Sequence, residues 1–215
     1  LLDDIYKTYL LRDVRSYVKN EDFVGFNKML KLLAAQIGNL VNLNELSRSS
    51  GLTHRKCEEY ISLLEQMYII ILLEPYQSNK RNAIKKMKKV YFSDLGLRNI
   101  IYGSFQSIEM RTDNGALFEN FVLLELLRNT GKQTHINFFR TTDGTEIDFI
   151  LNTLKETIAA EVKFKRLENP VSIKSMDTFF DNDTIGKRYI FNKNFNYTIN
   201  NKKYIQAYLA GKIQI

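Results

Sequence analysis

Two apolar stretches joined by a short polar turn decide the fold of the second half of the chain. They read Thr145-Glu146-Ile147-Asp148-Phe149-Ile150-Leu151 and Ile158-Ala159-Ala160-Glu161-Val162-Lys163-Phe164. Both have the length and the β-branched content of strands, and the polar turn between them predicts a hairpin. Because side chains alternate between the faces of a strand, Glu161 and Lys163 share a face. The hairpin therefore predicts that Asp148, Glu161 and Lys163 gather in one small area.

Two carboxylates and one ammonium group in such an area indicate a divalent-metal site. Carboxylates held together repel one another unless a cation or a proton relieves them, and one lysine neutralises only part of the charge. The same alternation of charged and apolar residues is also typical of a half-solvated strand whose charges face water. The periodicity alone leaves both interpretations open.

The acids and the lysine also carry a resemblance to a known family. Asp148 followed by Glu161-Val162-Lys163 resembles the core of the PD-(D/E)xK nuclease superfamily, which has the restriction-endonuclease and Holliday-junction-resolvase fold. That superfamily has a further acid on a helix before the hairpin, and the helical stretch from Gly115 to Val122 supplies Glu119. The resemblance implies catalytic residues and ligands for Mg²⁺ or Mn²⁺ among Glu119, Asp148 and Glu161. It also implies that Lys163 orients the nucleophile or neutralises the scissile phosphate.

Composition limits the class of protein. The chain has 215 residues, of which 44% are hydrophobic, and it can form one large or two modest folded domains. No apolar run can span a bilayer and no signal peptide opens the chain, so we expect no membrane partner. The single cysteine, Cys57, fits a cytoplasmic location, and with two histidines it argues against structural zinc. Because the chain begins at Leu1 rather than methionine, we expect a fragment.

Basic residues concentrate in one stretch of the chain. The net charge is +7. A single acid-free stretch contains Lys80, Arg81, Lys85, Lys86, Lys88 and Lys89. A local basic patch attracts polyanions more strongly than scattered charge does, and it predicts contact with DNA. The alternative is a solvated loop that lysines keep soluble.

The N-terminal half has the order of a winged helix. Apolar spacing predicts helices over residues 1–20 and 21–37, a short helix capped by Asn42, and a longer helix capped by Thr53. Gly51 makes the tight turn between the last two helices, and strands over residues 68–73 and 90–92 follow. A helix-turn-helix with a two-stranded wing predicts a winged-helix domain over residues 21–112.

The longer helix after Gly51 is the one that can enter the major groove of DNA. Its exposed N-terminal face carries His54, Arg55 and Lys56, and Cys57 lies on its apolar face. Many winged helices instead bind proteins or join domains, since a fold does not fix a function. DNA contact and protein contact are therefore alternatives for this helix.

The remainder, residues 113–215, is predicted as a second, α/β domain. We expect a helix capped by Ser93 before it, a helix from Gly115 to Arg128 and a strand over 135–140 that enters the hairpin. A helix over 171–180 and strands over 187–191 and 204–209 follow. Arg140 either meets a phosphate or pairs with an acid. Lys165 and Arg166 lie just past the expected site, where a nucleic-acid backbone would pass.

A second resemblance extends over most of the chain. Its stretches include Leu11-Arg12-Asp13-Val14, Tyr60-Ile61-Ser62-Leu63-Leu64-Glu65, Lys89 to Leu97, Leu117 to Val122, Phe139-Arg140-Thr141, Glu146-Ile147-Asp148 and Glu161-Val162-Lys163. They resemble the C-terminal part of a bacterial and archaeal family in which an AAA-type ATPase module precedes an uncharacterised region. This resemblance implies an upstream ATPase module that binds ATP, with residues 1–20 as the connector. No G-x-x-x-x-G-K-[ST] occurs in the sequence, so we expect no P-loop ATP site here.

The sequence therefore predicts a mixed α/β protein with an N-terminal winged-helix domain and a restriction-endonuclease-like domain. Our first expectation is a DNA-binding accessory region of an AAA-type ATPase with a nuclease-like metal site. One alternative is an active Mg²⁺-dependent endonuclease or resolvase that cleaves DNA phosphodiesters. The other is a regulatory module that docks on the ATPase domain.

Overall fold

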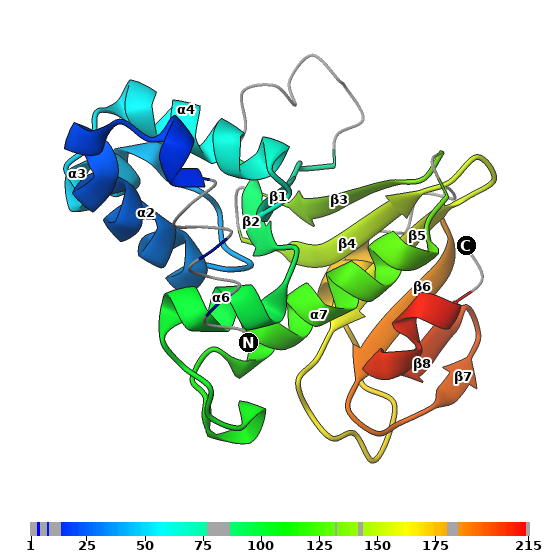
Figure 1. Cartoon of the computed structure of the whole chain (residues 1–215). Coiled ribbons are helices and arrows are strands. Elements are labelled where there is room, and N and C mark those ends of the chain that lie inside the picture. The colour runs from blue at the N-terminus through cyan, green and yellow to red at the C-terminus, as the bar shows by residue number, and fades with distance from the viewer. Residues whose placement is uncertain are drawn as a thin grey trace. The chain divides into compact units, whose positions relative to one another are not determined.

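A computed structural model of the chain describes residues 4, 8, 14–76, 87–131, 133–141, 144–179 and 185–213. The protein has the mixed α/β fold that the sequence predicts, and it divides into two compact units (Figure 1). Unit 1 comprises Leu1–Leu72 with Met87–Arg111, and unit 2 comprises Leu73–Lys86 with Thr112–Ile215. Every helix among the described residues is too short or too polar to cross a membrane.

Unit 1 consists of helices and a small sheet. Its elements are η2 (Val14–Tyr17), η3 (Asn20–Asp22), α2 (Phe23–Ala35), α3 (Leu43–Ser50), α4 (His54–Gln66), β1 (Ile70–Leu73), β2 (Lys89–Phe92), α6 (Leu95–Tyr102) and η4 (Ile108–Met110). Strands β1 and β2 pair with each other. The helices and strands of unit 1 follow one another in the order that the sequence predicts, with β1 beginning two residues later than predicted. The helix expected over 1–20 falls mostly outside the described residues.

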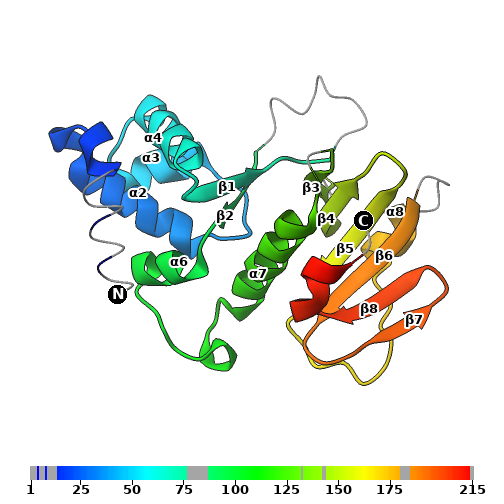
Figure 2. The ribbon, with the colours of Figure 1, turned by 45° about the vertical axis from the view of Figure 1, so that its right-hand side comes forward.

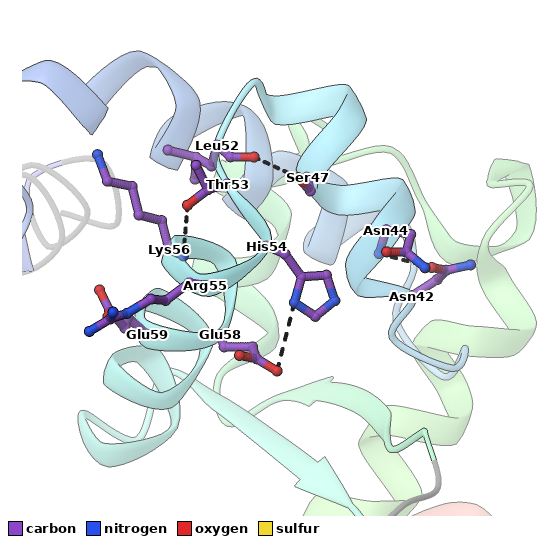
Figure 3. A network of polar contacts seen from close by, with 10 residues as sticks. All are labelled: Asn42, Asn44, Ser47, Leu52, Thr53, His54, Arg55, Lys56, Glu58 and Glu59. Carbon is purple, nitrogen blue, oxygen red and sulfur yellow. Dashed lines mark hydrogen bonds and ion pairs between the residues drawn. The ribbon is translucent and has the colours of Figure 1, made fainter.

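The turn between α3 and α4 forms through local hydrogen bonds. The Asn42 side chain accepts from two backbone N–H groups of α3, at 3.1 and 3.2 Å, and Thr53 Oγ1 accepts from the first turn of α4 at 3.3 Å. Gly51 ends α3 with φ at 79°, a conformation that side chains with a Cβ rarely adopt. The caps predicted at Asn42 and Thr53 are confirmed (Figure 3).

The cap predicted for α6 is wrong by one residue. Asp94, rather than Ser93, caps the helix, because Oδ1 of Asp94 accepts a hydrogen bond from the N–H of Leu97 at 2.6 Å. The hydroxyl of Ser93 instead donates to the carbonyl of Tyr68. Both residues have side chains suited to a cap, and the tertiary contact with Tyr68 decides between them.

Unit 2 contains a mixed sheet with the strand order β3-β4-β5-β6-β8-β7. The strands are β3 (His135–Arg140), β4 (Glu146–Asn152), β5 (Thr157–Val162), β6 (Ile185–Asn192), β7 (Tyr197–Ile199) and β8 (Lys202–Gln206). Strand β4 is antiparallel to β3 and to β5, which gives the predicted hairpin, whereas β5, β6 and β8 run parallel. The three-residue strand β7 was not predicted, because so short a run carries no clear period.

Helices cover the sheet of unit 2. In Figures 1 and 2, α7 (Asn114–Asn129) and the red helical turn η5 (Ala207–Lys212) lie over the same face of the sheet. Met176 of α8 (Lys174–Phe179) packs in a buried cluster with Ile150, Ala159 and Ile190. The last predicted strand, over 204–209, ends at Gln206, and the chain continues as η5.

The short segment after β1 belongs to unit 2 rather than to the predicted winged-helix range. The N–H of Tyr76 donates to the carbonyl of Phe138 at 2.6 Å, and the N–H of Phe138 donates to the carbonyl of Glu74 at 3.1 Å. These bonds extend the edge of the sheet at β3. This pairing is too short to leave a periodic pattern in the sequence, so it could not be predicted.

Candidate functional site

The hairpin of β4 and β5 brings Asp148 and Glu161 to neighbouring positions. Phe149 pairs with Ala160, so Asp148 and Glu161 come next in the register. Opposed residues of an antiparallel pair point to the same face. The Oδ2 atom of Asp148 accepts a hydrogen bond from the N–H of Val162 at 2.7 Å. One carboxylate oxygen of Asp148 is therefore fixed by the backbone of the neighbouring strand.

Lys163 lies directly after β5, which ends at Val162, two residues earlier than predicted. Its N–H donates to the carbonyl of Phe191 at 2.8 Å, which continues the alignment with β6. The Nζ atom of Lys163 lies 2.6 Å from Oε1 of Glu161. The side chain of Glu161 is 8% exposed and that of Lys163 is 43% exposed. The ion pair therefore links a buried carboxylate to the surface.

Burial and charge act in opposite directions on this ion pair. Burial raises the pKa of Glu161, and the nearby charge of Glu119 adds to the rise, while Lys163 opposes it. Burial alone would lower the pKa of Lys163, but the charges of Glu161, Asp148 and Glu119 outweigh it and raise that pKa. Lys163 is therefore a persistent cation at neutral pH.

The second oxygen of Glu161 is the distinctive atom of the site. Oε2 is buried and has no hydrogen-bond partner among the described residues. A buried carboxylate oxygen that lacks a partner has lost hydration without replacement, which costs free energy. The atom is therefore a candidate ligand for a cation or an acceptor for a bound group.

The three acids expected to bind a metal share one electrostatic environment but not one coordination sphere. Glu119 of α7 lies near enough for its charge to act on both Glu161 and Lys163. In the described part of the chain, however, no three His, Cys, Asp or Glu residues lie close enough together to hold a metal ion. Carboxylate oxygens are the ligands that Mg²⁺ prefers, so the donors at Asp148 and Glu161 fit such an ion in kind.

A turn after β6 supports the segment that carries Lys163. Asn192 is fully buried, and its amide nitrogen donates to the carbonyls of Phe195 at 2.9 Å and Ile205 at 3.3 Å. Its Oδ1 accepts from the N–H groups of Asn194 and Phe195, at 3.0 and 2.7 Å. Asn192 thereby fixes the conformation of the turn between β6 and β7.

Asn194 connects this turn to the segment after β5. Its side chain accepts from the N–H of Leu167 at 2.9 Å and donates to the carbonyl of Leu167 at 3.2 Å. We call the two residues, Asn192 and Asn194, the asparagine clamp. No sequence signal marks this clamp, because asparagines are common in turns of every kind.

Aromatic contacts hold the acid-bearing helix against the same segment. The rings of Phe118 and Phe164 meet edge to face with their centroids 5.2 Å apart. Nζ of Lys193 lies 4.3 Å from the centroid of the Phe164 ring, at cation–π distance. Phe118 precedes Glu119 and Phe164 follows Lys163, so this contact couples the positions of the two charged residues.

Three further basic residues predicted to meet nucleic acid lie in unit 2. Arg140 pairs with Glu146, with NH1 3.4 Å from Oε2, so the acid is its partner here. Lys165 and Arg166 are exposed just beyond Lys163, and the ion pairs found among the described residues involve neither of them. These two side chains are therefore open to an anionic partner.

The basic residues of α4 are all engaged by acids. Figure 3 shows His54 turned toward Glu58 and Arg55 beside Glu59, whereas Lys56 points away from both. The pairs are His54 with Glu58 at 3.9 Å, Arg55 with Glu59 at 2.9 Å and Lys56 with Asp22 at 2.5 Å. Glu58 and Glu59 follow His54 and Arg55 by one helical turn in the sequence, a local pairing that the prediction of a DNA contact left out. The expected DNA-facing end of α4 is therefore close to neutral.

The basic stretch before β2 is only partly described. Lys80, Arg81, Lys85 and Lys86 lie outside the described residues, and Lys88 is half-buried. Lys89 is 2% exposed, so its prediction as a nucleic-acid contact is wrong. The reason is its place in β2, where all four residues are buried. Its charge does not contribute to a surface patch.

Two family models match the chain. The first is described as "Domain of unknown function (DUF8612)" and matches residues 1–108. The chain belongs to this family. The second, "Domain of unknown function (DUF4143)", matches residues 114–209, which include the four residues of the candidate site. No solved structure matches the chain.

Relatives of this DUF8612 chain occur in distant bacteria. An uncharacterised protein of Haemophilus influenzae is 25% identical over 174 residues, covering 79% of this chain and 41% of the relative. An uncharacterised protein of Mycobacterium tuberculosis is 24% identical over 176 residues, covering 81% of this chain and 39% of the relative. The chain therefore spans about two-fifths of the length of these curated relatives.

Proposed function

We propose that unit 2 is a nuclease-like module that binds the phosphodiester backbone of nucleic acid. In this proposal the chain is the DNA-binding accessory region of a larger, AAA-type ATPase. Two findings support it: the PD-(D/E)xK pattern of Glu119, Asp148, Glu161 and Lys163, and the match of the surrounding residues to DUF4143. The matched relatives are more than twice as long as the aligned region, which leaves room for an ATPase module in those proteins.

One observation carries the proposal. Glu161 is buried with one oxygen on Lys163 and the other without a partner in the described residues, while the charges of Asp148 and Glu119 act on the same lysine. On a charged strand face that only meets water, the carboxylates are exposed and hydrated. They are not buried with an oxygen that lacks a hydrogen-bond partner. A site that accepts a cation and an anionic phosphate together accounts for both features.

The side chains have distinct roles in this site. Glu161, through Oε2, and Asp148 would hold Mg²⁺ or Mn²⁺, and Glu119 would approach as the third acid. When bound, such an ion activates water and stabilises charge on a phosphate. Lys163 presents its ammonium to a phosphate oxygen, and its raised pKa keeps it charged while it does so. Lys165 and Arg166 extend the cationic surface along the backbone.

Binding and cleavage are tested separately on the 215-residue chain. Binding of labelled single-stranded, duplex and branched DNA is measured by fluorescence anisotropy in Ca²⁺ at several salt concentrations. We expect log Kd to depend on log salt, because contacts with phosphates release counterions. Cleavage of the same DNAs and of supercoiled DNA is then followed in Mg²⁺ and in Mn²⁺.

Matched variants decide the outcome. Glu161→Gln keeps the shape and removes the charge, and Lys163→Met keeps the aliphatic stem and removes the ammonium. Lys155→Ala removes an exposed lysine in the turn between β4 and β5 as the control. Cleavage that persists in Glu161→Gln and Lys163→Met would come from a contaminant. DNA binding with the same affinity and salt dependence in Lys163→Met and the wild type would contradict the proposed phosphate site.

A second candidate function, protein docking by unit 1, is favoured by the ion pairs of α4. A helix that enters the major groove needs free cations, whereas α4 presents cations and acids one turn apart. Mixed charge of this kind suits a complementary protein surface. In this alternative unit 1 is a winged helix that docks on the upstream ATPase module. Co-purification with that module, expressed separately, tests the docking, and Arg55→Glu with Glu59→Arg as a double charge swap provides the matched variant.

A further inference from the structure

Unit 2 has a pocket that shares no lining residue with the carboxylate site. It has a volume of about 380 Å³ and is lined by Tyr189, Lys203, Ile205, Leu209, Lys212 and Ile213. Its walls come from β6, β8, η5 and the residue after η5. Pockets of a few hundred Å³ are of the size that takes small ligands.

The register of the sheet places this pocket on the other face from Glu161. Ile150 pairs with Ala159, Ala159 with Arg188 and Arg188 with Lys202, so these residues share a face. By alternation along β5, Glu161 lies on that face as well. Tyr189 and Lys203 pair with each other on the opposite face, over which η5 lies. A ligand in the pocket is therefore distinct from one at Glu161.

Four of the six residues that line the pocket are aromatic or aliphatic. Tyr189 is 1% exposed and its ring stacks on Phe191, with the ring centroids 6.0 Å apart. Ile205, Leu209 and Ile213 supply aliphatic side chains. Such walls favour a ligand with an apolar body, because burying apolar surface is worth about 25 cal/mol per Å².

Within the described part of the chain, the two lysines that line the pocket have no acidic partner. The ion pairs and hydrogen bonds found among the described residues involve the side chain of neither Lys203 nor Lys212. The nearby acids are already engaged: Glu125, beside Gly211, pairs with Arg128, and Glu156, near Tyr189, pairs with Lys187 at 2.5 Å. The pocket therefore combines an apolar interior with uncompensated positive charge.

We propose that this pocket binds an organic anion with a compact apolar body, such as a medium-chain or aromatic carboxylate. The carboxylate lies between the ammonium groups of Lys203 and Lys212, and the apolar body packs against Tyr189, Ile205 and Leu209. Both features are needed. An inorganic anion offers no surface to the apolar walls, and a neutral or cationic amphiphile leaves the lysines without a partner.

The experiment is an NMR titration of the 215-residue chain with methyl-labelled isoleucine and leucine. Decanoate is the probe, decylamine has the same body with the opposite charge, and inorganic phosphate has the charge without the body. We expect decanoate to shift the methyl signals of Ile205, Leu209 and Ile213 saturably, and decylamine and phosphate to leave them in place. A titration with decanoate in neutral phosphatidylcholine vesicles distinguishes binding of the free ligand from binding of a membrane surface.

Two double variants locate the charge. Lys203→Ala with Lys212→Ala should weaken decanoate about tenfold or more, equivalent to about 1.4 kcal/mol. Lys155→Ala with Lys174→Ala removes the same net charge from exposed positions of unit 2 and should leave the affinity unchanged. Equal binding of decanoate and decylamine, or shifts spread over the methyl groups of the α8-side core, overturns the proposal. These two readouts use the wild-type chain, so they decide the matter even if a variant fails to fold.

Discussion

The ammonium of Lys163 contacts one oxygen of Glu161 and leaves the other alone. Nζ lies 2.6 Å from Oε1, while Oε2 is buried and has no hydrogen-bond partner in the described part of the chain. The pair is thus half-satisfied. A half-satisfied buried carboxylate costs free energy, and it marks this position as one where packing alone does not explain the residue.

Removing the lysine should destabilise unit 2 in a pH-dependent manner. Lys163→Met leaves the Glu161 carboxylate buried without a cation, which should lower the free energy of unfolding by about 1–3 kcal/mol. The pKa of Glu161 is already raised by burial and should rise further. When a carboxyl has a raised pKa in the folded state, the protein loses stability as pH rises above the ordinary pKa of that carboxyl. The stability lost in Lys163→Met should therefore grow from pH 4 to pH 8.

Urea denaturation at several pH values measures this deficit. The double variant Lys163→Met with Glu161→Gln removes the buried charge together with its partner and should recover most of the loss. An equal loss of the free energy of unfolding at pH 4 and pH 8 would show that the charge of Lys163 does not affect the ionisation of Glu161.

The buried network of unit 1 should have the opposite pH dependence. Asp22 accepts hydrogen bonds from Lys56 Nζ at 2.5 Å and from the hydroxyl of Tyr60 at 2.7 Å. Burial by itself would raise the pKa of Asp22, but these two bonds outweigh it and lower the pKa. A carboxyl with a lowered pKa contributes stability above its ordinary value, 3.8, and that contribution is lost as pH falls.

Asp22→Asn tests the network. At pH 7 the change should cost about 1.5–3 kcal/mol, because it weakens hydrogen bonds to a charged group. As pH falls below 3.8, the difference between the variant and the wild type should shrink. The check is thermal unfolding followed by circular dichroism, with Glu21→Gln, which removes an exposed neighbouring acid, as the control. A constant difference across this pH range would contradict the assignment.

The asparagine clamp should control the mobility of the segment that carries Lys163. Asn194→Ala removes both side-chain bonds to Leu167 and leaves the interior of the turn intact. We expect a modest loss of stability, about 1 kcal/mol per bond at most, and faster hydrogen exchange at residues 165–167. Asn196→Ala, in the same turn region, serves as the comparison. Unchanged exchange at 165–167 would mean that the parallel alignment with β6 holds the segment unaided.

Gly25 should tolerate no side chain, in contrast to Gly115. A Cβ at Gly25 would lie 2.7 Å from Cδ2 of Leu52, so Gly25→Ala should cost about 1–3 kcal/mol through overpacking. A Cβ at Gly115 would meet nothing within 4 Å, and this glycine lies in α7. Gly115→Ala should therefore be neutral or stabilise by about 0.5–1 kcal/mol. Chemical denaturation of both variants measures the contrast, and equal effects would contradict the packing of α2 against Leu52.

The sequence was informative where a pattern is local. The caps at Asn42 and Thr53, the turn at Gly51 and the burial of Cys57 all follow from residues within a few positions of one another. The same holds for the hairpin of β4 and β5, whose alternation is visible in the sequence. The prediction from the sequence failed at Lys89. A run of lysines suggested an exposed surface there, but the strand that contains Lys89 is buried.

The sequence by itself determined the fold class, the helix caps at Asn42 and Thr53 and the hairpin that carries Asp148 and Glu161, because hydrogen bonding and apolar periodicity act over short distances along the chain. Only the tertiary structure decided which groups far apart in the sequence are paired. Asp22, which binds Lys56, the asparagines that hold the Lys163 segment and the lysines left at the pocket beside η5 come from separate elements. Coulomb and hydrogen-bond energies depend on distance in space, and folding alone sets that distance.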